Sequence, residues 1–307
     1  MKRKRNPGPV GGYHILIFLY HALPDFAFDT LVRYGALLAM LAMKKQREAS
    51  REYLRIALGK EPDFCEIWKH FDCFAQTLVL RLIAGKYKNA KLIHPQGHGE
   101  EFMSLVRSGA QVLYGTFHIG CSDLLGFCLA DGFCPISMIR LKVGNSHDVE
   151  RFTRHYKGLG LNIIWVNNPQ EIILGINNAI QRKDSIAMQC DRVDYSSKNE
   201  SFLFMGARRS FPFTIYHLSA IYRLPVAFCF SFNTKDGVIT HAPAPFYPAE
   251  SKKETLRLGR KHFQKLLTEV EELLREYPYH WFNFDGLNPI ANDDAKLERQ
   301  LSASACQ

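Results

Sequence analysis

Residues 161–191 read LNIIWVNNPQEIILGINNAIQRKDSIAMQCD, with two short apolar runs on either side of a segment of helical character. The runs LNIIWV and SIAMQCD predict strands, and PQEIILGINNAIQRK between them predicts a helix. Strand, helix and strand in this order form the repeating unit of a parallel sheet.

The same alternation extends from about residue 110 to 235. Further strands are predicted at 110–117, 134–141 and 224–232, and further helices at 122–132, 148–160 and 213–223. This pattern is typical of an α/β fold with a mostly parallel sheet flanked by helices. Ligands of such sheets bind beyond the carboxyl ends of the strands. His118, Arg140 and Asp191 each lie at or just after a predicted strand end, so we expect them at one edge of the sheet.

The amino-terminal region up to residue 85 is predicted to be helical. The segment QREASREYLRIALGKEP places Ala49, Tyr53, Ile56 and Ala57 on one face, and Gly59 and Pro62 end the helix. A second helix, FCEIWKHFDCFAQTLVLRLIAG, is rich in apolar residues and ends at Gly85.

Two apolar segments near the amino terminus suggest contact with a membrane surface. Ile15–Leu23 and LVRYGALLAMLAMKKQR are each shorter than the run of about 18 apolar residues that spans a bilayer. We favour two interfacial helices, with Lys2–Arg5 and Lys44–Arg47 facing anionic headgroups, over two core helices of a soluble protein. The predicted organisation is 1–45 for membrane association, 46–290 for the main domain, and 291–307 for a polar tail.

The composition is that of a globular protein. Of 307 residues, 47% are hydrophobic and 22% are charged, and the net charge is +9. The basic residues do not form one arm, and no nucleic-acid-binding motif is present, so a nucleic-acid partner is not expected. The eight cysteines form no Cys-x-x-Cys pair, which indicates reduced thiols rather than a metal site or a disulfide framework.

His118 and Asp123 stand five residues apart in QVLYGTFHIGCSD. On a continuous helix they would lie about 140° apart, but Gly115 and Gly120 make such a helix unfavourable. A strand, a turn and a new helix would let Asp123 fold back onto the imidazole of His118. Asp123 would then fix the tautomer, and the other ring nitrogen could act as a base.

This segment, FHIGCSD, resembles the His-x-x-x-x-Asp/Glu motif of the lysophospholipid acyltransferase superfamily, and is most similar to the late acyltransferases of lipid A biosynthesis. Four further blocks resemble that family in order: NSHDVERFTRHYKGLG, SIAMQCDRVD, FLFMGARRSFPFTIYHLSAIYRLPVAF and YPYHWFNF. The resemblance covers most of residues 10 to 285. Cys121 and Ser122 stand where the lipid A branch commonly has Asn-Trp, and Asp123 stands where it has glutamate, so the acceptor pocket is expected to differ.

The resemblance implies an acyltransferase at the cytoplasmic face of the cytoplasmic membrane. It implies that His118 is the general base and that Asp123 holds it. The donor would be an acyl thioester on acyl carrier protein or coenzyme A, the acceptor a lipid or lipid-like hydroxyl or amine, and no metal or other cofactor would be needed.

Several other polar residues are candidates for substrate binding. Arginines in these blocks suit phosphate groups or an acidic carrier protein, and a strand-end aspartate suits either the site or a turn cap. The alternative for each arginine is a solvated surface charge. The candidates are Arg140, Arg154, Asp191, Arg192, Gly206, Arg208 and Arg209.

Two other functions remain open from the sequence. Cys121 lies near His118 and could serve as the nucleophile of a thioesterase-like hydrolase. Alternatively, the chain could be a lipid-binding protein that keeps the fold without catalysis. Trp281 and Phe282 are interpreted as core aromatic residues rather than substrate contacts.

Overall fold

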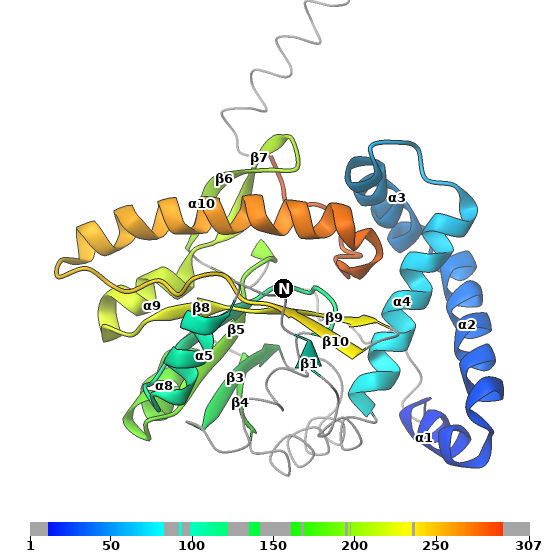
Figure 1. The fold of residues 1–307 in the computed structure, drawn as a ribbon, viewed down its shortest axis with the longest axis horizontal. Helices are drawn as coiled ribbons and strands as arrows, with labels where there is room; N and C mark the ends of the chain where they lie inside the picture. Colours follow the sequence, from blue (N-terminus) through cyan, green and yellow to red (C-terminus); the bar gives the residue numbers. More distant parts are fainter. Residues whose placement is uncertain are drawn as a thin grey trace, which may run out of the picture.

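The central feature is a five-stranded parallel sheet with strand order β4-β3-β5-β2-β8 (Figure 1). The computed structural model describes residues 12–82, 92–93, 99–121, 135–141, 161–166, 169–193, 196, 198–234 and 237–290. The strands of this sheet are β2 (Leu113–Thr116), β3 (Ile136–Leu141), β4 (Leu161–Val166), β5 (Ser185–Gln189) and β8 (Val226–Phe228). The predicted α/β fold is confirmed.

Helices cover both faces of this sheet. Phe117, just after β2, is fully buried in the main core, where its ring lies 6.3 Å from that of Phe263 on α10 (Lys252–Glu276). Tyr114 points to the opposite face and packs against Phe102 of α5 (Glu100–Arg107). Helices α8 (Pro169–Gln181) and α9 (Thr214–Tyr222) add buried residues to the main core.

The amino-terminal region is helical, as predicted. Its helices are α1 (Gly12–Ala22), α2 (Asp25–Ala42), α3 (Lys44–Leu58) and α4 (Phe64–Leu82). They gather at one end of the sheet, at the right of Figure 1. Gly59 follows α3 with a φ of +67°, a left-handed conformation that glycine adopts without strain, which explains why the helix stops there.

Within the described residues, no single helix is both long enough and apolar enough to cross a bilayer. Only α2 and α3 taken together reach that length and composition, and their axes meet at 98°.

One predicted strand, 224–232, is in fact two strands in different sheets. β8 ends at Phe228, and β9 (Phe230–Thr234) joins β10 (Gly237–His241) and β1 (Leu92–Ile93) in a separate three-stranded sheet. The last pair between β8 and β2 is Phe228 opposite Gly115, and β2 ends one residue later at Thr116. Beyond this point Ser231 bridges to Gly120 in the turn after β2.

The segment around Arg208 and Arg209, to which no secondary structure was assigned from the sequence, is a β-hairpin. Its strands are β6 (Asn199–Phe204) and β7 (Ala207–Pro212). Met205 and Gly206 form the two-residue turn, with φ angles of +50° and +77°. Neither α5 nor α10 was predicted from the sequence. The helices predicted at 122–132 and 148–160 lie outside the described residues.

Candidate active site

His118 and Asp191 occupy equivalent positions after two neighbouring strands. β2 and β5 pair in parallel with Thr116 opposite Gln189, and the N–H of Cys190 extends the ladder to the carbonyl of Thr116 at 2.8 Å. His118 and Asp191 each follow two residues after these paired ends. The register of the sheet therefore brings the imidazole and the carboxylate together, and their predicted convergence is confirmed.

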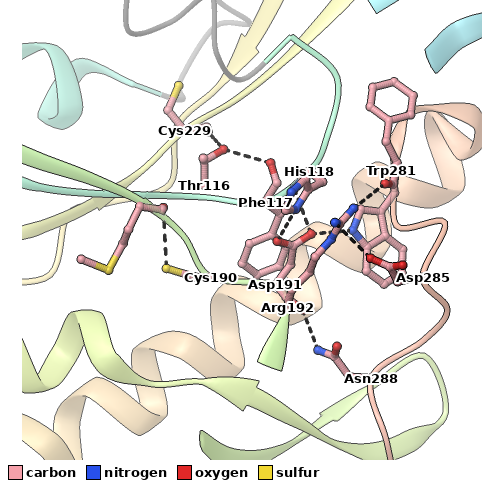
Figure 2. Close-up of polar contacts among 12 residues, drawn as sticks. Thr116, Phe117, His118, Cys190, Asp191, Arg192, Cys229, Trp281, Asp285 and Asn288 are labelled. Carbon is pink, nitrogen blue, oxygen red and sulfur yellow. Dashed lines mark hydrogen bonds and ion pairs between the residues drawn. The ribbon is translucent and has the colours of Figure 1, made fainter. Parts of the chain in front are cut away.

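The carboxylate of Asp191 accepts three hydrogen bonds (Figure 2). Its Oδ1 lies 2.7 Å from Nδ1 of His118. Its Oδ2 accepts the backbone N–H of His118 at 2.9 Å and the indole N–H of Trp281 at 3.0 Å. One carboxylate thus fixes both the ring and the backbone of the same histidine.

This contact determines which nitrogen of His118 carries the proton in the neutral ring. An ionised carboxylate only accepts hydrogen bonds, so Nδ1 must be the donor and Nε2 must hold the lone pair. The side chain of Asp191 is fully buried, whereas 20% of the His118 side chain is exposed. Nε2 has no hydrogen-bond partner among the described residues, so it is placed to take a proton from a substrate.

Asp191 stays ionised although it is buried. Burial raises the pKa of its carboxyl group. The charge of His118 and its hydrogen bonds, together with the charge of Arg192, outweigh this effect and lower the pKa to about 2.

The turn that carries His118 is held between two other segments. The N–H of Gly120 donates to the carbonyl of His280 at 2.7 Å, and the N–H of Cys121 donates to that of Ser231 at 2.7 Å. Gly120 has a φ of +51°, and a Cβ atom there would lie 2.0 Å from the Ser231 oxygen. Only glycine fits this position without moving the turn.

Asp123 lies outside the described residues, so its predicted role stays a prediction. The partner that the structure gives to Nδ1 of His118 is Asp191. Asp191 itself was expected to contact substrate. Because its carboxylate is buried and bonded to His118 and Trp281, it positions the histidine instead.

Arg192 connects the turn after β5 to the carboxyl-terminal segment. Its guanidinium donates to the carbonyl of Phe282 at 3.0 Å and to the carboxylate of Asp285 at 3.2 Å. These contacts make Arg192 part of the framework of the site, where the sequence analysis expected a substrate contact.

Among the described residues, the three candidates on the hairpin form no hydrogen bond with His118, and they differ in their surroundings. Gly206 is the turn residue and Arg208 is exposed on β7. Arg209 is buried and donates to the carbonyl of Asn288 at 3.0 Å, while the side chain of Asn288 donates to the carbonyl of Asp191 at 2.7 Å. Arg209 therefore supports the Asp191 turn through Asn288.

Of the two remaining candidates, Arg140 is among the described residues and Arg154 is not. Arg140 is half-buried near the carboxyl end of β3, on the same sheet edge as His118, with β5 between β3 and β2. Its place is compatible with the predicted role in binding. Arg154 lies outside the described residues.

Cys121 and Trp281 were both interpreted from the sequence, with different outcomes. The thiol of Cys121 belongs to a residue that is only 1% exposed, which disfavours attack on a bulky acyl thioester. Trp281 is a core aromatic residue, as interpreted, but the sequence analysis missed its hydrogen bond to Asp191. Only the tertiary fold reveals this contact, because the residues are 90 positions apart.

No protein-family model matches the chain, and no curated protein matches it. The chemistry of the site therefore rests on its own geometry.

Proposed function

We propose that this protein is an acyltransferase that works at a membrane surface and moves a fatty acyl group from an acyl thioester to a hydroxyl or amine of a lipid. The observation that carries the proposal is the His118–Asp191 pair, with Nδ1 bonded to a buried carboxylate, Nε2 without a hydrogen-bond partner among the described residues, and the His118 side chain 20% exposed. The ordered sequence blocks that resemble lipid acyltransferases support the same reaction.

In the proposed reaction, Nε2 of His118 removes the proton from the acceptor as its oxygen or nitrogen attacks the thioester carbonyl carbon. A bond from acceptor to acyl carbon forms, and the carbon–sulfur bond breaks. The proton on the imidazolium passes to the departing thiolate, which leaves as a thiol. Asp191 stabilises the transient imidazolium through the 2.7 Å contact with Nδ1.

The donor we propose is the acyl thioester of acyl carrier protein or of coenzyme A. Both are anionic, and the net charge of +9 favours their approach. Along α10 from its first residue to Lys265, exposed cations are available to face such a partner: Lys252, Lys253, Arg257, Arg260, Lys261 and Lys265.

The exposed stripe of α2 supports the membrane assignment. Because successive residues turn by about 100°, Phe28, Val32, Ala36 and Met40 form one buried stripe, and the opposite side of the helix faces outward. The outward stripe is apolar apart from Thr30, whose hydroxyl donates to the carbonyl of Phe26 at 2.7 Å. Two charged residues, Asp29 and Arg33, are also exposed and lie beside it. Its large exposed members are Phe26, Leu31, Tyr34, Leu38 and Leu41.

Cations stand at the end of this apolar stripe. Lys44 and Lys45 are exposed just beyond α2, and Arg47 donates to the carbonyls of Met40 and Leu41 at 3.1 Å each. An apolar helix face flanked by lysines matches the interface of an anionic bilayer. The proposed partner of α2 is therefore an anionic lipid surface.

The chain is expected to float with vesicles that contain an anionic phospholipid at low salt. Rising salt should release part of it, because surface charges are screened within about 8 Å at physiological ionic strength. Leu38→Glu should lower the bound fraction strongly. The matched control is Ile221→Glu on α9, since Ile221 and Leu38 are 57% and 66% exposed. A chain that stays soluble at low salt, or equal loss in both variants, would contradict the membrane assignment.

The proposed reaction is tested with acyl carrier protein that carries a radiolabelled acyl chain. The assay is run with and without extracted membrane lipid. Label should move to lipid, and only when lipid is present. Release of free fatty acid without lipid would indicate a hydrolase, and no turnover of either kind would indicate a binding protein. Cys121→Ser should retain most of the transfer, as should the control Cys65→Ser at an exposed thiol. An acyl group trapped on Cys121 would overturn the mechanism.

A further inference from the structure

Trp281 contacts the His118–Asp191 pair through the carboxylate of Asp191. The residue is 1% exposed, and its indole N–H is one of the two donors on Oδ2 of Asp191. The other donor, the backbone N–H of His118, lies on the turn that Asp191 orients. The indole therefore holds the carboxylate oxygen that the histidine ring does not contact.

The backbone around Trp281 also pairs with the turn of His118. Trp281 forms an antiparallel bridge with Ile119. On either side of this bridge, the N–H of Phe282 donates to the carbonyl of His118 and the N–H of Gly120 donates to the carbonyl of His280, each at 2.7 Å. Residues 280–282 thus extend along the turn as a short strand would.

The helical layer in turn fixes Trp281. Nε2 of His70 on α4 lies 2.9 Å from the Trp281 carbonyl, and Nδ1 lies 2.8 Å from the hydroxyl of Ser50 on α3. Burial lowers the pKa of His70 to about 4, so the ring is neutral near pH 7. Because a carbonyl only accepts, Nε2 carries the proton and Nδ1 accepts from Ser50. Tyr53 adds a bond from its hydroxyl to the Pro278 carbonyl at 2.8 Å.

We propose that Trp281 is a positioning residue of the His118–Asp191 pair, because its indole N–H aligns the Asp191 carboxylate and its backbone holds the His118 turn against the helices α3 and α4. The catalytic consequence rests on the proposed function. The structural part, the orientation of the His118 ring, does not.

Trp281 is expected to affect kcat and not the KM for substrate. Its side chain is buried, so it reaches the substrate only through Asp191 and His118. Trp281→Phe keeps an aromatic ring in the core and removes the N–H donor. Loss of one hydrogen bond to a charged group corresponds to a roughly ten- to hundredfold lower kcat, and KM should stay within about twofold.

The matched control is Trp68→Phe on α4. The indole of Trp68 also donates to a carbonyl, that of Arg33, but at 3.4 Å and away from the site. Both variants should melt as cooperatively as the unmodified chain. Only Trp281→Phe should lower kcat, and only it should shift or broaden the ¹⁵N-detected Nδ1–H signal of His118.

The ring signal separates this inference from the proposed function. If no acyl transfer is found but Trp281→Phe alone perturbs the His118 signal, the positioning role stands and the activity fails. An unchanged signal together with an unchanged kcat would overturn the role. If Trp281→Phe does not fold, benzothienylalanine is placed at position 281 instead. It replaces the indole N–H with sulfur at nearly constant shape, and kcat and the His118 Nδ1–H signal are measured as before.

Discussion

Replacing His118 by asparagine is expected to lower acyl transfer by roughly 10²- to 10⁴-fold, the range that a general base contributes. Asparagine has an amide nitrogen near the position of Nδ1 but no group in place of Nε2. It can keep a donor on Oδ1 of Asp191, which accepts Nδ1 at 2.7 Å in the unmodified chain. The substitution therefore removes the base and keeps the partner of the buried carboxylate.

The comparison with His118→Ala makes this result interpretable. Alanine would leave Oδ1 of Asp191 without its donor, and a buried carboxylate that loses a hydrogen bond costs about 1–3 kcal/mol or more. We expect His118→Ala to melt at a lower temperature than His118→Asn, with both equally inactive. Near-normal transfer by folded His118→Asn would exclude His118 as the base.

The sheet was predictable because its signals are local. The segments of β2, β3, β4 and β5 are short apolar runs, and the sequence between β4 and β5 shows helical spacing. The prediction of a single strand at 224–232 was wrong. The run 224–232 is apolar except for Ser231, so nothing local marks Cys229 as the point where the chain passes from one sheet to the other.

The hairpin β6–β7 carried a signal that could have been used. Phe202 and Phe204 alternate with exposed residues, and Met205-Gly206 is a two-residue turn that ends in glycine. The nearby pair Arg208-Arg209 was considered only as a candidate for binding phosphate or an acidic carrier protein. In the structure the period of two along β7 points these arginines to opposite faces, one exposed and one buried.

The partner of His118 could not be found from sequence spacing alone. Asp123 is five residues from His118, whereas Asp191 is 73 residues away and becomes a neighbour only through the order and register of β2 and β5. The sequence predicted only that His118 and Asp191 both lie at one edge of the sheet, and not that their side chains bond to each other. Trp281 lies still farther along the chain, after a long helix that was not predicted.

Asp191→Asn is expected to lower kcat by about 10²- to 10⁴-fold, and more than Asp123→Asn does. An imidazole has two nitrogens. Asp191 occupies Nδ1, and Nε2 must stay free to accept a proton, so a second carboxylate cannot orient the ring without blocking the base. Asparagine at 191 presents one oxygen and one NH₂ to three donors. Bonding between its NH₂ and Nδ1 would place the proton on Nε2, the wrong tautomer for a base.

The lowered pKa of Asp191 allows the Asp191→Asn and Asp123→Asn variants to be compared near neutral pH. The pKa of Asp191 in the folded chain is about 2, below its ordinary value of 3.8. A carboxyl group with a lowered pKa stabilises the fold above its unfolded pKa, and this stabilisation is lost as pH falls from about 4 toward 2. Asp191 is therefore fully ionised at every pH near 7, and a change of assay pH in that range does not alter its contribution.

The two variants are compared by single-turnover rates, by melting, and by the ¹⁵N spectrum of His118. Asp191→Asn should lose the Nδ1–H signal and show the Nε2–H tautomer, while Asp123→Asn should keep the original tautomer and lose at most about tenfold in rate. Abolished transfer in Asp123→Asn, with Asp191→Asn active and its tautomer unchanged, would return the orienting role to Asp123. If both variants lose transfer, the spectrum still decides, because only the residue that holds Nδ1 can change the position of the ring proton.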